Sequence, residues 1–203
     1  YFIDEKETNL ELSKPMAGRD VLILAPGRTL ADYKDSIDNL INVKRPIVVA
    51  VNFTSSQFKI DYVFRSNMRR YVKIQGRTKA KCIITSNMKD AFSYDYMVNF
   101  SKYSSMMPEI IDNSGLMALR LMLALGVNNV FVAGMDGYTT LTDQNYFDQM
   151  LEYDFSKEAE KRNTLISAEI KSLSKKMNIQ FITPTSYKIS KLTFKKEGER
   201  SIV

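Results

Sequence analysis

The stretch NSGLMALRLMLALGVNNVFVAG, residues 113–134, contains the two elements that decide the fold. Its first half is an apolar run of helical length that closes at Gly126, and glycine commonly ends a helix. Its second half, from Asn129, is a short continuous apolar run that stops at Gly134. Strands covered on both faces of a parallel sheet have this uniformly apolar character. The stretch therefore predicts a helix that turns directly into a buried strand.

The same order of elements occurs near the start of the chain. VLILAPG, residues 21–27, and PIVVAVNF, residues 46–53, are two further apolar runs. Between them, TLADYKDSIDNLI, residues 29–41, carries apolar residues at helical spacing, and Thr29 is placed to cap the start of that helix. These three segments predict a β-α-β unit, whose crossover is right-handed in nearly all proteins.

The remaining segments continue this pattern. Residues 61–64 and 81–87 are strand candidates, and residues 94–105, YDYMVNFSKYSS, are predicted to be only weakly extended. Residues 156–178 read as a long amphipathic helix, and residues 179–184, IQFITP, as a final strand. The sequence thus predicts an α/β fold of Rossmann-like type, a three-layer sandwich with a mainly parallel sheet.

The composition excludes several kinds of site. The chain has 203 residues, of which 44% are apolar, and this suits one globular domain. A single cysteine, Cys82, allows neither a disulfide framework nor a cysteine-based zinc site. The chain has no histidine, so histidine-based metal sites, Ser-His and Cys-His nucleophiles and a histidine general base are excluded.

Charge and apolar patterning indicate how the chain is organised. Residues 1–20 are charged and are interpreted as a linker from an upstream domain, residues 21–190 as the α/β domain, and residues 191–203 as a basic tail. The net charge of +6 is assigned mainly to a solvated basic end, and we do not expect a nucleic-acid partner. No apolar run approaches the ~20 residues of a membrane span, so we expect a cytoplasmic protein.

Polar residues follow several of the predicted strands, and ligands of such sheets bind at the carboxyl ends of the strands. Glycine lets a backbone approach a phosphate, a helix start offers N–H groups to an anion, asparagine can both donate and accept, and tyrosine donates without adding charge. These properties together suit a nucleotide. The residues at these ends are Gly27, Arg28, Thr29, Asn52, Asn67, Gly134, Asp136 and Tyr138, while Asn113, Ser114 and Gly115 open the second apolar helix and Tyr146 follows in the loop. Arg69 and Arg70, close after the third strand, are candidates either for phosphate binding or for the surface.

LILAPGRTL, VNF, RSN, the helix-strand-loop block from Asn113 to Tyr138, and IQFITPTS together resemble the bacterial sialyltransferases of glycosyltransferase family 42. They also resemble the related hydroxymethylpterin diphosphokinase-like domains. The likeness covers residues 21–186, and it implies a nucleotide or nucleotide-sugar ligand and a role in surface-polysaccharide synthesis. The helix-strand-loop block is its most specific part.

The resemblance also implies roles for individual residues. Gly27 and Thr29 would lie by the nucleotide phosphate, and Asn52 and Asn67 would flank the ribose and phosphate. The turn from Asn113 to Gly115 would lie near the sugar nucleotide. Gly134 and Asp136 match positions of the family's loop after the buried strand. Tyr138 and Tyr146 match its two tyrosines, of which the second helps to hold the departing phosphate.

The family's histidine base has no counterpart in this chain. If the domain is a transferase, we expect Tyr138 and Tyr146 to stabilise the leaving phosphate and Asp143, Asp148 or Glu152 to act as the base. A carboxylate can serve only where its surroundings raise its pKa. No metal or cofactor is expected for this activity.

Two other functions remain open. A diphosphokinase-like transfer from ATP would need Mg²⁺, for which Asp136 is a candidate ligand, although Asp136 could equally brace its own loop. The first three motifs also resemble the domain that follows a TIM-barrel aldolase of the HMG-CoA-lyase type in some surface-polysaccharide proteins. That resemblance implies a non-catalytic accessory domain that docks onto an upstream enzyme.

Overall fold

The computed structural model of the chain describes residues 2–74, 76, 78–141, 145–146 and 156–189. Its centre is a seven-stranded sheet in the order β5-β4-β3-β2-β1-β6-β7, and every paired strand is parallel to its neighbour. The strands are β1 (Asp20–Leu24), β2 (Ile47–Val51), β3 (Tyr62–Arg65), β4 (Lys81–Thr85), β5 (Tyr96–Val98), β6 (Asn129–Ala133) and β7 (Asn178–Phe181). The predicted Rossmann-like α/β class is confirmed, with a sheet that is entirely parallel where it is described.

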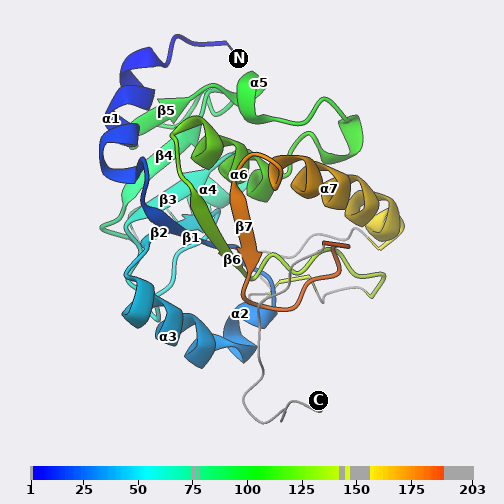
Figure 1. Cartoon of the computed structure of the whole chain (residues 1–203). Helices are drawn as coiled ribbons and strands as arrows, with labels where there is room; N and C mark the ends of the chain where they lie inside the picture. Colours follow the sequence, from blue (N-terminus) through cyan, green and yellow to red (C-terminus); the bar gives the residue numbers. More distant parts are fainter. Residues whose placement is uncertain (1, 75, 77, 142–144, 147–155, 190–203) are drawn as a thin grey trace.

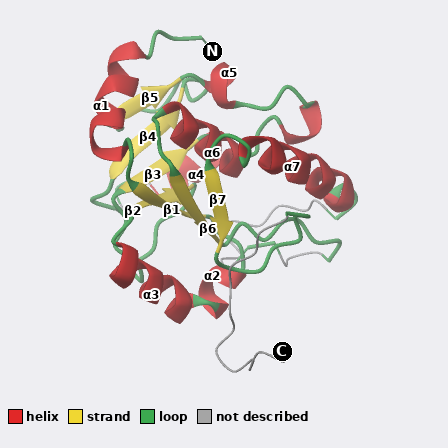
Figure 2. Cartoon of the chain, in the orientation of Figure 1, coloured by secondary structure: helices red, strands yellow, loops and turns green. Residues whose placement is uncertain are grey.

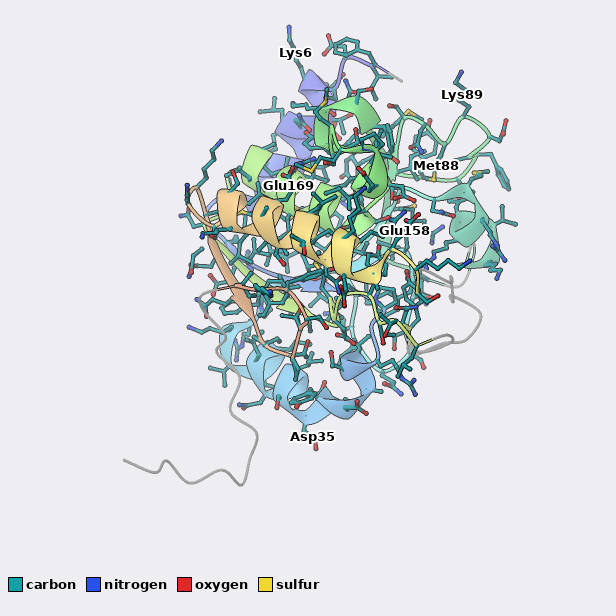
Figure 3. The ribbon with its side chains drawn as sticks, turned by 90° about the vertical axis from the view of Figure 1, so that its right-hand side faces the viewer. Lys6, Asp35, Met88, Lys89, Glu158 and Glu169 are labelled. Atoms are coloured by element: carbon teal, nitrogen blue, oxygen red, sulfur yellow. The ribbon has the colours of Figure 1, made fainter. Side chains whose placement is uncertain are left out.

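Helices cover both faces of this sheet (Figure 1, Figure 2). They are α1 (Lys6–Met16), α2 (Thr29–Asp32), α3 (Lys34–Lys44), α4 (Met68–Ile74), α5 (Phe100–Tyr103), the 3₁₀ turn η1 (Pro108–Ile110), α6 (Ser114–Ala124) and α7 (Ala159–Leu173). The helices α2, α3 and α4 pack on one face, and α1, α6 and α7 pack on the other. Asp35 on α3 accordingly lies on the opposite side of the sheet from Glu169 on α7 and from Glu158, which precedes α7 (Figure 3).

Strand β1 shows why the sheet is apolar throughout. Val21 and Ile23 face the layer of α1, α6 and α7, whereas Leu22 and Leu24 face α2 and α3. Both sets are buried because each face of a parallel sheet is covered by crossover helices. The uninterrupted apolar runs in the sequence are the direct result.

The predicted helix over residues 29–41 is divided in two. Tyr33, with φ −114° and ψ 25°, leaves the helical region between α2 and α3. The short α2 is bound through Thr29 to the loop after β6, while α3 turns to bury Ile37 against the sheet. The weakly extended segment 94–105 likewise has two parts, since β5 occupies its middle and α5 follows.

The expectation that residues 1–20 form a linker differs from what the structure shows. Residues 6–16 form α1, which lies beside β5 (Figure 1) and fully buries Leu12 and Met16. Before this helix, the buried carboxylate of Glu5 accepts hydrogen bonds from the Asn99 N–H at 2.6 Å and the Tyr103 hydroxyl at 2.9 Å. Only two apolar side chains of α1 are fully buried, so the sequence shows little helical periodicity here and a linker is predicted. The segment is part of the α/β domain.

The predicted basic tail, residues 191–203, lies outside the described residues. None of the helices in the described part of the chain is long and apolar enough to cross a membrane.

Candidate functional site

A cavity of about 240 Å³ opens at the carboxyl edge of the sheet. It lies where the strand order reverses. Strands β2 to β5 extend the sheet on one side of β1, whereas β6 and β7 extend it on the other side. Loops after β1 and β6 therefore run to opposite faces and leave a crevice, which is the usual ligand position in open α/β sheets. The lining residues are Ala25, Pro26, Gly27, Val51, Asn52, Asn67, Arg70, Asp112, Asn113, Ser114, Gly115, Gly134, Met135, Asp136, Gly137, Tyr138, Asn145, Tyr146 and Tyr187.

The floor of the cavity is a closed contact between the loops after β1 and β6. The Gly27 N–H donates to the Gly134 carbonyl at 2.7 Å. The Asp136 carboxylate accepts from the Thr29 N–H at 2.9 Å and from the Thr29 hydroxyl. A Cβ on Gly27 would lie 2.3 Å from the Gly134 oxygen and 2.5 Å from the Asp136 Cγ, so only glycine fits.

This contact corrects the role expected for Thr29. The Thr29 side chain does not cap its own helix, because it donates to Asp136. The Thr29 N–H is also occupied, so it is not available to a phosphate as the sequence predicted. Gly27 is needed for the approach of the protein's own loop, and it also lines the cavity.

Asp136 braces the loop. Burial raises the pKa of its carboxyl group above the ordinary value, although hydrogen bonds from Thr29 act in the opposite direction. Both carboxylate oxygens are engaged by Thr29. Within the described ranges, no three acidic or cysteine side chains are grouped so that they could hold a metal ion.

Asn52 joins the ends of β2 and β3 to the start of α6. It has the left-handed φ of 58°, which asparagine tolerates better than most residues. Its Nδ2 donates to the Ser114 Oγ at 2.6 Å, and its Oδ1 accepts from the Ser66 N–H at 3.1 Å. The Oγ atoms of Ser66 and Ser114 are 2.5 Å apart. This network fixes the start of α6 against the sheet edge.

The start of α6 faces the cavity and has an explicit cap. The Asn113 Oδ1 accepts from the Leu116 N–H at 2.9 Å, and its Nδ2 donates to the Tyr138 hydroxyl at 3.3 Å. A helix start leaves N–H groups without intrahelical partners. Those of Ser114 and Gly115 have no partner among the residues that the structure describes. Because the helix dipole is positive here, this end favours an anion.

Among the described residues of the lining, Arg70 is the cation. Arg69 is exposed, whereas Arg70 is only 6% exposed and places its guanidinium 4.5 Å from the centroid of the Tyr146 ring. The Arg70 N–H donates to the Asn67 Oδ1 at 3.2 Å, so Asn67 helps to begin α4. Local sequence patterns do not distinguish the two arginines, because which of two neighbouring helical residues is buried depends on how the short helix packs on the sheet.

Tyr138, another residue of the lining, is held in place by α7. Its N–H donates to the Asn163 Oδ1 at 2.8 Å, and the Asn163 Nδ2 donates back to the Tyr138 carbonyl at 2.7 Å. The Arg162 guanidinium lies 5.8 Å from the centroid of the Tyr138 ring. Burial raises the pKa of the Tyr138 hydroxyl, so this group stays protonated and can donate.

The structure places the predicted residues in three groups. Arg28 and Thr29 do not line the cavity, and Asp143, with the alternative bases Asp148 and Glu152, lies outside the described residues. The cavity brings together Gly27, Asn52, Asn67, Asn113, Ser114, Gly115, Gly134, Asp136, Tyr138 and Tyr146.

Sequence reasoning did not select Asp112, Asn145 or Tyr187. Asp112 precedes the cap of α6 and could have been found from that position, whereas Asn145 and Tyr187 carry no local signal.

No protein-family model matches the chain, and none of the curated proteins matches it either. The chemistry of the cavity itself therefore carries the functional inference.

Proposed function

We propose that the domain binds a nucleotide or nucleotide sugar in this cavity, as a glycosyltransferase-type domain of surface-polysaccharide synthesis. One observation carries the proposal of binding. The capped start of α6 and the buried Arg70 line the same crevice, at the point where the sheet reverses its strand order. The glycosyltransferase setting rests on the resemblance of the motifs.

The charges of the lining support an anionic ligand. Arg70 and the N–H groups of Ser114 and Gly115 favour negative oxygens. Two acidic residues also line the cavity, but each has a partner. Asp136 accepts from Thr29, and the Asp112 Oδ1 lies 3.7 Å from Nη1 of Arg162.

Size and polarity support a mononucleotide. Pockets for drug-sized ligands usually measure roughly 300–1,000 Å³. At about 240 Å³, this cavity suits one nucleotide unit better than a dinucleotide. The side-chain amides of Asn52, Asn67 and Asn145 supply both donors and acceptors, which recognition of a base or ribose requires.

Binding has more support than transfer. The chain has no histidine, and the cavity-lining Asp136 already accepts two hydrogen bonds from Thr29. A transferase would need a carboxylate whose pKa is raised and which can reach the acceptor hydroxyl. Diphosphokinase-type transfer has little support, because the described residues contain no group of three acidic side chains that could hold Mg²⁺.

Titration calorimetry of the full chain with CMP, UMP, GMP and AMP tests this proposal. We expect at least one of them to bind with 1:1 stoichiometry. Arg70→Gln should weaken that binding by about tenfold, because it removes a charged hydrogen-bond donor. The matched control is Arg69→Gln, which removes the same charge one residue away at an exposed position and should change affinity by less than about twofold.

Two outcomes would contradict the proposal. The first is that none of the four nucleotides binds to the wild-type protein. The second is that Arg69→Gln and Arg70→Gln weaken binding equally, which would indicate general attraction to a basic protein with no role for the cavity. Thermal unfolding of both variants shows whether either one has lost its fold.

A further inference from the structure

Tyr187 lies at the edge of the cavity on a segment that is firmly attached to the loop after β6. The Gly134 N–H donates to the Thr183 Oγ1 at 2.9 Å, and the Thr185 hydroxyl donates to the Met135 carbonyl at 2.9 Å. The Ser186 N–H donates to the Asp136 carbonyl at 2.7 Å. These bonds align residues 183–186 beside the cavity and fix where Tyr187 stands.

The ring of Tyr187 is also fixed. It packs edge-on against Phe181 of β7, with ring centroids 6.4 Å apart and an interplanar angle of 76°. The side chain is only 5% exposed and belongs to the apolar layer under α6 and α7. The ring is therefore held by packing alone, without any hydrogen bond from its hydroxyl.

The hydroxyl of Tyr187 has no hydrogen-bond partner among the residues that the structure describes. The hydroxyls of two other buried tyrosines have protein partners. That of Tyr103 donates to Glu5, and that of Tyr71 accepts from the N–H of Ser93 at 2.9 Å. Tyrosine hydroxyls at buried sites usually find such a partner. The Tyr187 oxygen itself is not fully buried, so its accessible side is open to the cavity that the residue lines. Since Tyr187 lines the cavity, the missing partner is expected to come from a ligand.

The surroundings of the hydroxyl decide what it can do. Burial raises the pKa of Tyr187 well above 10, and the nearby Tyr138, Tyr146 and Asp136 raise it further. The group therefore stays protonated and serves as a donor, not as a base. A ligand oxygen that only accepts hydrogen bonds matches it best.

We propose that Tyr187 donates a hydrogen bond to a phosphate oxygen of the bound nucleotide. This inference rests on the proposed function and assigns the phosphate to the end of the cavity formed by Tyr138, Tyr146 and Tyr187. Non-bridging phosphate oxygens accept several hydrogen bonds and donate none at neutral pH, so a cluster of hydroxyl donors suits them.

The test pairs a variant with a change in the ligand. Calorimetry compares the nucleoside monophosphates CMP, UMP, GMP and AMP with their nucleosides, on the wild-type full chain and on Tyr187→Phe. For the monophosphate that binds, we expect Tyr187→Phe to weaken affinity by about tenfold. Affinity for the corresponding nucleoside should stay within about twofold, because only the phosphate meets the hydroxyl.

The control is Tyr96→Phe, which removes the same hydroxyl from β5 at the far edge of the sheet and should leave both affinities unchanged. Without ligand, Tyr187→Phe should melt at the wild-type temperature or above it, because the lost hydroxyl made no internal bond. A clearly lower melting temperature would assign the hydroxyl a structural role and overturn the inference.

The remaining results separate this inference from the proposed function. If the wild-type protein binds no nucleotide, the proposed function and the role of Tyr187 are both wrong. If it binds a monophosphate and Tyr187→Phe binds it equally well, only the role of Tyr187 is wrong. An equal loss of affinity for monophosphate and nucleoside would also overturn the assignment of the phosphate to this end.

Discussion

At the scale of single residues, Gly27 has the strictest steric requirement in the site. Its absent side chain makes room for the Gly134 carbonyl and the Asp136 carboxylate, which fix the loops after β1 and β6 together. Gly27→Ala should lower the free energy of unfolding by about 1–3 kcal/mol. The new Cβ would clash with the Gly134 carbonyl and the Asp136 carboxylate, and neither group can move aside without breaking its hydrogen bonds.

Gly115→Ala is the matched control for this prediction. Its Cβ would lie 2.8 Å from the Cε of Met135, the end of a flexible side chain that can move aside. It should therefore cost less than about 1 kcal/mol. Urea unfolding of both variants measures the difference, and a Gly115→Ala variant as unstable as Gly27→Ala would refute the account of the floor.

Single residues also show where sequence reasoning stops. Polar residues after a strand could be predicted to gather at one edge, and Asn52 and Asn67 do so. The partner of Thr29 could not be predicted, because Asp136 lies 107 residues away and a local cap explained Thr29 equally well. Tyr187 gave no signal, since an unpaired hydroxyl is visible only when all its neighbours are placed.

At the scale of elements, α1 differs most from its sequence-based prediction, because the sequence predicts a linker where the structure has a packed helix. Leu12 is fully buried on its inner side, whereas Leu10 of the same helix is 62% exposed. Leu12→Ala should lower the free energy of unfolding by about 2–5 kcal/mol, and Leu10→Ala should change it by less than about 0.5 kcal/mol. Denaturant unfolding provides the comparison, and equal effects would mean that α1 does not pack on the sheet.

The difference between α1 and the other elements has a physical cause. Strands such as β2 are buried on both faces, so every residue is apolar and the sequence pattern is sufficient to predict the strand. Helix α6 is likewise apolar over most of its surface. In α1 only Leu12 and Met16 are fully buried, and the bonds that fix its start come from Asn99 and Tyr103, far along the chain.

At the scale of the whole molecule, the order of the strands creates the cavity. The alternation of strands and helices predicted a parallel sheet with covered faces, but it did not predict which strand stands beside β1. The placement of β6 on the free side of β1 brings the Gly134 to Tyr138 loop opposite the ends of β2 and β3. That placement depends on packing between distant elements, which local sequence patterns do not record.

The central claim is that this cavity binds a nucleotide, and backbone amide NMR shifts recorded during a titration with CMP, UMP, GMP or AMP test it most directly. We predict saturable shifts at Ser114, Gly115 and Gly137, with none along β5 at the far edge of the sheet. Because the shifts locate the ligand, they separate cavity binding from general attraction to a chain of net charge +6. An absence of shifts, or shifts confined to residues away from the cavity, would contradict the account.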